Sequence, residues 1–388
     1  MPATDSGEQI QHRLLETLDS KNGKHLDPTS PAPVRMMAAR GMAPLPPRDM
    51  VVVLCGLSLD ADASLAQAAQ QALQKLPEQI VGGAIDGGLP AEALDILVDY
   101  LDGRDPLIEK LLVDRNTPDG VIAKLAPGLS EALAEIVLAD QQRALRSQDI
   151  VRGIAQNPNA LKSSLDRMFD FLVRSGVFHE GMPQFAEAFA RLSPSEQREA
   201  ADQVSLPQEA SALLDESRDA NVDHKAMEAA LDAQQSQDGG PADSEAPQDE
   251  NQQRVPMLKL VASLNVSQKI ALAMKGNKEA RAILLRDSNK LVATAAIRNP
   301  GITEQEVVAA AGNRSISEEV LRIIAQSKDM VRPYSVKVAL VHNPKTPLQV
   351  AMKFLSLLRG HDLRDVAKSR NISSAVANQA KRMLNKKR

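Results

Sequence analysis

Lysine and arginine side chains in the C-terminal third of the chain have the type and spacing best suited to binding chemistry. Residues 256–388 carry 24 Lys and Arg against 9 Asp and Glu. A row of such cations on one face would neutralise phosphates or carboxylates, and counterion release would make the binding steeply salt-dependent. We predict that an anionic partner is bound by Arg298, Arg314, Arg322, Lys337, Lys353, Arg364, Lys368 and Arg370.

Catalytic chemistry is not indicated by any combination of residues. The six histidines are spread along the chain, and no two have the i, i+4 spacing that puts two imidazoles on one helix face. The glycine pairs at 82–83 and 87–88 lack the Gly-Lys-Ser/Thr of a phosphate loop, and Asp60 and Asp62 lack the downstream Glu of a calcium loop. We therefore predict no catalytic residue, no metal site and no cofactor, so that the protein is not an enzyme.

The single cysteine, Cys55, lies within the longest apolar run of the chain, Met50 to Leu57. This position predicts a small buried hydrophobic side chain rather than a reactive thiol. The low cysteine content favours a reducing cytoplasm. The apolar run is too short to span a membrane, and the first twenty residues lack the apolar stretch of a signal peptide.

Helices are the elements that must position these side chains. Aromatic residues make up 2% of the chain and there is no Trp, so the cores must consist of aliphatic side chains, which suit helix-on-helix packing. From Val34 to Leu214, short apolar-periodic stretches alternate with Pro, Gly or Asp breaks. The pattern predicts an all-α fold of short helical hairpins stacked in series as an α-solenoid.

Composition also suggests where the domains begin and end. Residues 216–254 contain ten Asp and Glu against three Lys and Arg, which is typical of a disordered acidic linker. We predict a disordered arm at 1–33, an N-terminal helical-repeat domain at 34–215, the linker at 216–255 and a basic C-terminal helical-repeat domain at 256–388. The charge placement also allows the linker to contact the C-terminal domain within the same molecule.

An Asn-containing turn recurs in the basic domain. An Ala-containing helix runs into an Asn, and a new helix starts at a Ser or Thr a few residues later, around Asn299, Asn313, Asn343 and Asn371. Asn tolerates the left-handed backbone that closes a helix, and Ser or Thr caps the next one. Thr303 and Glu306 have the spacing of a capping box. The segment Arg115 to Pro118 and, more faintly, Gln156 to Pro158 repeat the turn in the first half. We interpret these residues as helix punctuation, with direct ligand contact by Asn299 or Asn343 as the alternative.

At these turns the chain resembles α-solenoids of the HEAT-like and leucine-rich-repeat-variant kind, and as a whole it resembles an uncharacterised bacterial helical-repeat family. The resemblance covers the C-terminal 130 residues and, more weakly, residues 34–158. It implies a binding scaffold rather than a reaction. Some leucine-rich-repeat-variant proteins carry a cysteine-ligated iron–sulfur cluster, which a chain with Cys55 alone cannot build.

We therefore expect a non-enzymatic scaffold or adaptor in the bacterial cytoplasm that binds a protein with an acidic surface. The alternative is binding of nucleic acid through the phosphate backbone by the C-terminal domain. Against it, single-strand platforms stack bases on aromatic rings, and this domain offers only Tyr334 and Phe354.

Overall fold

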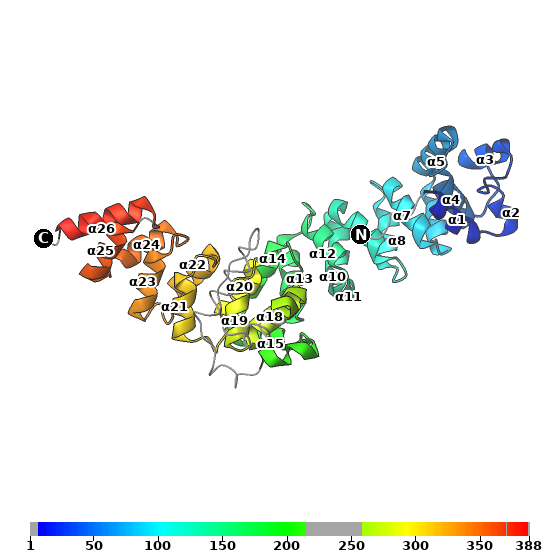
Figure 1. Ribbon diagram of the computed structural model, residues 1–388. Coiled ribbons are helices and arrows are strands. Elements are labelled where there is room, and N and C mark those ends of the chain that lie inside the picture. The colour runs from blue at the N-terminus through cyan, green and yellow to red at the C-terminus, as the bar shows by residue number, and fades with distance from the viewer. Residues whose placement is uncertain (1–6, 215–257, 370, 387–388) are drawn as a thin grey trace, which may run out of the picture. The chain divides into compact units, whose positions relative to one another are not determined.

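The computed structural model describes residues 7–214, 258–369 and 371–386, and throughout these ranges every regular element is a helix (Figure 1). The all-α prediction is confirmed. Contacts along the chain divide it into two compact units, Met1–Met168 and Phe169–Arg388.

The first unit is built from short helices joined by tight turns. They are α1 (Gly7–Glu16), α2 (Ser20–Gly23), α3 (Ala32–Ala39), α4 (Pro47–Leu57), α5 (Ala63–Lys75), α6 (Glu78–Asp86), α7 (Ala91–Leu97), η1 (Val98–Tyr100), α8 (Asp105–Val113), α9 (Asp119–Leu125), η2 (Ala126–Gly128), α10 (Glu131–Ala139), α11 (Gln141–Arg146), α12 (Gln148–Ala155) and the start of α13 (Lys162–Arg174). From α4 onward, each even-numbered helix packs on the next, α4 on α6, α6 on α8, α8 on α10 and α10 on α12. This is the contact pattern of stacked hairpins.

Helix α4 is the centre of the N-terminal end of this unit. Residues Val51 to Leu57 are all buried, and α4 packs against α1, α3, α5, α6 and α7. Leu14 of α1 and Leu26 are also buried, and Leu26 fills the space that a Cβ at Gly56 would need, 2.6 Å from its Cδ1 atom. Residues 7–33, predicted to be a disordered arm, are therefore an ordered part of the unit, because these leucines have a prepared site on α4.

The second unit continues with similar short helices. After the end of α13 come α14 (Pro183–Arg191), α15 (Pro194–Asp202), η3 (Gln208–Leu213), α18 (Val266–Lys275), α19 (Lys278–Leu284), α20 (Lys290–Ile297), α21 (Glu304–Gly312), α22 (Glu318–Gln326), α23 (Tyr334–His342), α24 (Leu348–Leu355), α25 (Gly360–Lys368) and α26 (Ser374–Lys386). One layer contains α18, α20 and α22, packed in that order, and the other contains α21, α23 and α25. Helix α24 pairs with α23 and packs on α26.

The helices on either side of the acidic segment belong to the same unit. Helix α15 packs on α18, and the Asn277 backbone N–H donates to the Leu213 carbonyl at 2.8 Å. The Ser267 hydroxyl accepts from the Phe178 N–H at 3.1 Å. The division between units thus falls at Met168 and Phe169 and not at 216–255, where composition had placed it. The acidic segment itself, and its expected contact with the C-terminal domain, lie outside the described residues.

The Asn turns connect successive repeats through their side chains. The Asn343 amide donates to the carbonyls of Ala311 and Asn313 at 2.8 and 2.9 Å, while its oxygen accepts the Lys345 N–H at 3.0 Å. The Asn299 amide likewise donates to the Ala273 carbonyl at 2.8 Å, and its oxygen accepts the Gly301 N–H at 2.7 Å. Each Asn closes its own turn and satisfies a carbonyl at the end of a helix in the preceding repeat.

This geometry confirms the punctuation interpretation and corrects its mechanism. Asn299 and Asn343 are 5% and 4% exposed, so neither presents a side chain to a ligand. The left-handed backbone expected for these residues is absent: Asn343 has φ −81°, and across the described ranges only glycines have positive φ. The side-chain amide, rather than the backbone conformation, is what the turn requires.

The capping box at Thr303 and Glu306 is confirmed, and it has a second role. The Glu306 carboxylate accepts from the Thr303 N–H at 2.8 Å and also from Arg281 Nε of α19 at 2.8 Å. Both side chains of the ion pair are almost fully buried, 4% and 1% exposed. Burial alone would raise the pKa of Glu306, but hydrogen bonds from Arg281 and Thr303 hold it below the ordinary value. The pair therefore joins the start of α21 to α19.

Replacing Asn343 by alanine should destabilise the protein. We expect the free energy of unfolding to fall by about 2–3 kcal/mol, because the buried carbonyls of Ala311 and Asn313 lose their donor. Asn116→Ala is the matched control, since this exposed Asn sits in the corresponding turn of the first unit and its side chain makes no such bond. Equal effects of the two substitutions in urea unfolding would contradict the role of the amide.

Replacing Glu306 by glutamine should cost more, about 3–5 kcal/mol, because the buried Arg281 charge loses its partner. The folded-state pKa of Glu306 is lowered from 4.5, so its contribution is present above that value and is lost as the pH falls through the folded pKa. Urea unfolding at a series of pH values should therefore show the two proteins converging in acid. The exposed Glu304→Gln is the control, and a constant gap down to low pH would rule out the linkage.

Candidate binding surfaces

The predicted anion-binding residues are distributed over both helical layers of the second unit. Arg298 follows α20, Arg322 lies on α22 and Lys353 on α24, whereas Lys337 lies on α23 and Arg364 and Lys368 on α25; Arg314 is in the turn after α21. Arg370 lies outside the described residues. The helices alternate between layers, so these cations do not follow one layer as a single row.

Three of these residues are engaged within the fold. Arg298 is half-buried, and its burial lowers the pKa of its guanidinium. Arg322 pairs with Glu318 at 2.9 Å, and Lys337 donates to the Arg332 carbonyl at 3.0 Å. The first is partly withdrawn from solvent, and the other two already have an acceptor. Their availability to a partner is correspondingly reduced.

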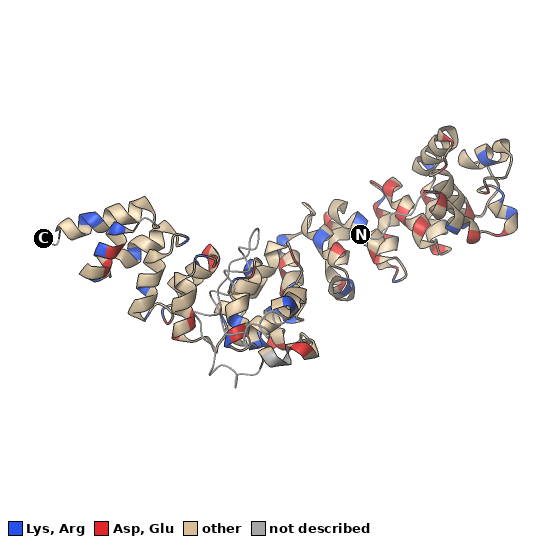
Figure 2. Ribbon diagram, viewed as in Figure 1, with Lys and Arg blue, Asp and Glu red and all other residues tan. Residues whose placement is uncertain are grey.

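The remaining cations are exposed, and all but Arg314 lie on α24 and α25 near the C-terminal end of the unit. Arg314, Lys353, Arg364 and Lys368 are exposed, and no carboxylate in the described ranges pairs with them. Arg364 and Lys368 are four residues apart, on one side of α25. Helix α26 packs on α25 and adds the exposed Lys381 and Arg382 (Figure 2). We call Arg364, Lys368, Lys381 and Arg382 the α25–α26 cations.

The two aromatic residues of the predicted C-terminal domain are both engaged within the fold. Phe354 is 2% exposed. The Tyr334 ring is covered by the Arg359 guanidinium, 4.6 Å from the ring centroid, and its hydroxyl donates to Asp362 while accepting the Arg359 N–H at 2.8 Å. Tyr334 therefore fastens α23 to the start of α25.

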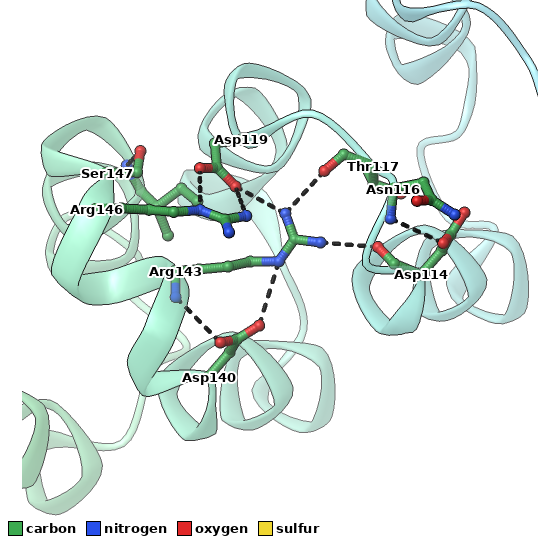
Figure 3. A network of polar contacts seen from close by, with 9 residues as sticks. Asp114, Asn116, Thr117, Asp119, Asp140, Arg143, Arg146 and Ser147 are labelled. Atoms are coloured by element: carbon green, nitrogen blue, oxygen red, sulfur yellow. Dashed lines mark hydrogen bonds and ion pairs between the residues drawn. The ribbon is translucent and has the colours of Figure 1, made fainter.

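The first unit contains an arginine network that the sequence pattern did not reveal (Figure 3). The Arg143 guanidinium is almost fully buried, and it donates to the carbonyls of Thr117 and Asp114 at 2.8 and 2.7 Å. It also contacts Asp119 at 2.8 Å and Asp140 at 3.2 Å. Arg143 thus does at this turn what the Asn amides do in the second unit.

The Asp114 turn shares only part of the hydrogen bonding of the Asn turns. Here Asp114 takes the place of the Asn: its carboxylate accepts the Asn116 N–H at 2.9 Å, as Asn343 accepts that of Lys345. A carboxylate has no N–H to donate to the preceding repeat. Arg143 reaches this turn from α11 and donates to the carbonyls of Asp114 and Thr117, which lie 29 and 26 residues before it.

A hollow of about 410 Å³ lies beside this network, lined by Arg115, Ala139, Asp140, Gln141, Gln142, Arg143 and Arg146. Arg146 makes two hydrogen bonds to Asp119, at 2.6 and 2.8 Å. Those bonds and the ones from Arg143 hold the pKa of Asp119 below its usual value despite partial burial. Because Arg143 and Arg146 are engaged, Arg115 and the two glutamines are the groups left to meet a ligand, which is a weak basis for a binding site.

Metal and membrane chemistry find no support in the described ranges. No group of three or more His, Cys, Asp or Glu side chains there is arranged to hold a metal ion. No helix in those ranges is both long enough and apolar enough to cross a membrane.

Comparison with known proteins does not identify the chain. No family model matches it, and no curated protein matches it. A solved crystal structure of an engineered protein aligns over 98% of both chains at 15% identity, with a TM-score of 0.18. A score that low gives no basis for transferring fold or function.

Cys55 should be unreactive in the folded protein. It is fully buried on α4, and burial raises the pKa of its thiol, so the nucleophilic thiolate is scarce. We expect a disulfide reagent to label native protein far more slowly than protein unfolded in guanidinium. Gln74→Cys, at an exposed position of α5, supplies an accessible thiol for comparison. Labelling of Cys55 at the rate of that thiol would contradict its burial.

Proposed function

We propose that this protein is a non-enzymatic interaction scaffold that binds an acidic surface of a partner protein through the α25–α26 cations. The observation that carries the proposal is the exposure of these four cations without carboxylate partners in the described part of the chain. By contrast, the buried arginines Arg143 and Arg281 are paired with carboxylates within the fold. Unpaired charge at one end of a stack favours association with an oppositely charged surface.

The packing of the helices supports the further proposal that the scaffold is a helical repeat of the HEAT-like or leucine-rich-repeat-variant kind. Layers of short helices that contact mainly their neighbours form extended surfaces suited to binding. A reducing cytoplasm of a bacterial cell is part of the proposal, supported by the single buried cysteine.

Sequence-independent binding of a nucleic-acid backbone is the second candidate, favoured by the same unpaired cations. The positions of Tyr334 and Phe354 argue against single strands, because the Phe354 ring is buried and one face of the Tyr334 ring is covered by Arg359. A duplex, which is bound through phosphates alone, is the form of nucleic acid that remains compatible with this surface.

A charge-reversal experiment separates these candidates. The double variant Arg364→Glu with Lys368→Glu should weaken binding of labelled poly-glutamate by about tenfold or more, measured by anisotropy, because two contacts become repulsive. Arg115→Glu with Lys162→Glu makes the same charge change in the first unit and should have little effect. Nuclease-treated pull-downs with the same variants would then identify the protein partner.

Two results would count against the protein-binding proposal. If both double variants bound poly-glutamate equally well, the α25–α26 cations would not be the binding surface. If wild-type protein bound duplex DNA more tightly than poly-glutamate at the same ionic strength, with affinity falling log-linearly as salt rises, the nucleic-acid candidate would replace it.

A further inference from the structure

A groove between α3 and α5 in the first unit has the features of a docking site for a helix. It has a volume of about 510 Å³ and is lined from α3 and its end by Met36, Arg40 and Gly41. The facing wall is one side of α5 and the turn that follows it. The packing of α3 on α5 leaves this space unfilled.

Helix α5 has two faces with different roles. Leu65, Ala69 and Leu73 are buried against the rest of the unit. The groove is lined instead by Ser64, Ala68, Gln71 and Lys75, at spacings of four, three and four residues. This is the spacing with which one helix receives another. The small side chains of Ala68 and Ala72 allow a second backbone to approach closely.

Methionines supply exposed apolar surface on the α3 side. Met36 lines the groove, and the neighbouring Met37 and Met42 are 37% and 62% exposed. Methionine side chains are flexible and adapt to varied apolar partners. Met36 is the methionine that a partner in the groove would meet, because Met37 and Met42 are not among the residues that line it.

The charge of the groove defines its partner. Arg40 and Lys75 line it and are exposed, and its lining contains no Asp or Glu. No ion pair is made by either cation within the ranges that the structure describes. A partner that fills the groove must therefore bring its own carboxylates.

We propose that the α3–α5 groove binds an amphipathic helix of a partner protein whose polar side carries Asp and Glu. Apolar residues of that helix, one turn apart, pack on Met36, Ala68 and Ala72. Its carboxylates pair with Arg40 and Lys75, and Gln67 and Gln71 provide hydrogen bonds at the edge. This surface belongs to a different unit from the α25–α26 cations and does not depend on their function, so the chain carries two separate docking surfaces.

The test uses the full-length protein and labelled synthetic peptides. The first peptide consists of leucine and glutamate, with the leucines at helical spacing; a second has the same composition in scrambled order, and a third has lysine in place of glutamate. Fluorescence anisotropy should show the first peptide binding about tenfold or more tightly than either control, because the groove needs both the apolar stripe and the negative charge. Equal binding of the ordered and scrambled peptides, or no binding of the ordered one, would overturn the proposal.

Variants assign the binding to this groove. Arg40→Glu with Lys75→Glu should abolish the preference for glutamate over lysine, and Ala68→Trp should block the peptide by filling the groove. Gln74→Glu is the control, because Gln74 is an exposed residue of α5 that does not line the groove. Arg364→Glu with Lys368→Glu should leave binding of the ordered peptide unchanged, which separates this site from the surface proposed above.

Circular dichroism shows whether each variant is folded. If Arg40→Glu with Lys75→Glu lowers the helix content, the assignment of peptide binding to the groove rests on Ala68→Trp. Unchanged binding by a folded Ala68→Trp protein would refute the groove as the site. A loss of binding caused only by Arg364→Glu with Lys368→Glu would refute it equally.

Discussion

The fold depends on satisfying the carbonyls that short helices leave unpaired at their ends. Any helix leaves about four carbonyls unpaired in its last turn, so in a helix of two or three turns they are a large share of the backbone, and stacking buries them. Asn299, Asn343 and Arg143 meet this need by reaching from one repeat to the carbonyls of an earlier one. Asn157 acts likewise on Ala126 and Leu129, and Arg104 on Leu76.

Two side-chain solutions therefore serve one purpose. An Asn in the turn both accepts from its own turn and donates to the previous repeat, so one residue holds two segments. At the Asp114 turn, the carbonyls of Asp114 and Thr117 receive their donors from Arg143 of α11, and Asp119 and Asp140 pair with its charge. An arginine in this role needs carboxylates beside it, because a buried charge without a partner is destabilising. An asparagine needs none.

Much of the local structure could be predicted from the sequence, because it depends on nearby residues. The aliphatic composition, the capping box at Thr303 and Glu306, and the burial of Cys55 follow from types and spacings within one helix or turn. The carbonyls bonded by Asn343 lie 30 and 32 residues earlier, at no fixed spacing, and could not be anticipated. The same limit applies to Leu26, whose burial depends on Gly56, and to the division of the chain, which depends on α15 meeting α18. The sequence of a short helix also does not show to which layer the helix belongs. Arg322 and Lys337 were therefore predicted to lie on one face, whereas they lie on helices of different layers.

Five of the side chains that connect repeats point the same way along the polypeptide, whereas Gln11 and Arg48 donate to the later carbonyls of Gly56 and Gly88. Arg104, Arg143, Asn157, Asn299 and Asn343 each donate to carbonyls nearer the N-terminus. During synthesis on a ribosome, the carbonyls that these five side chains bond therefore emerge before their donors do. At these turns a repeat is closed only when the repeat after it has been made, so closure there follows the order of translation.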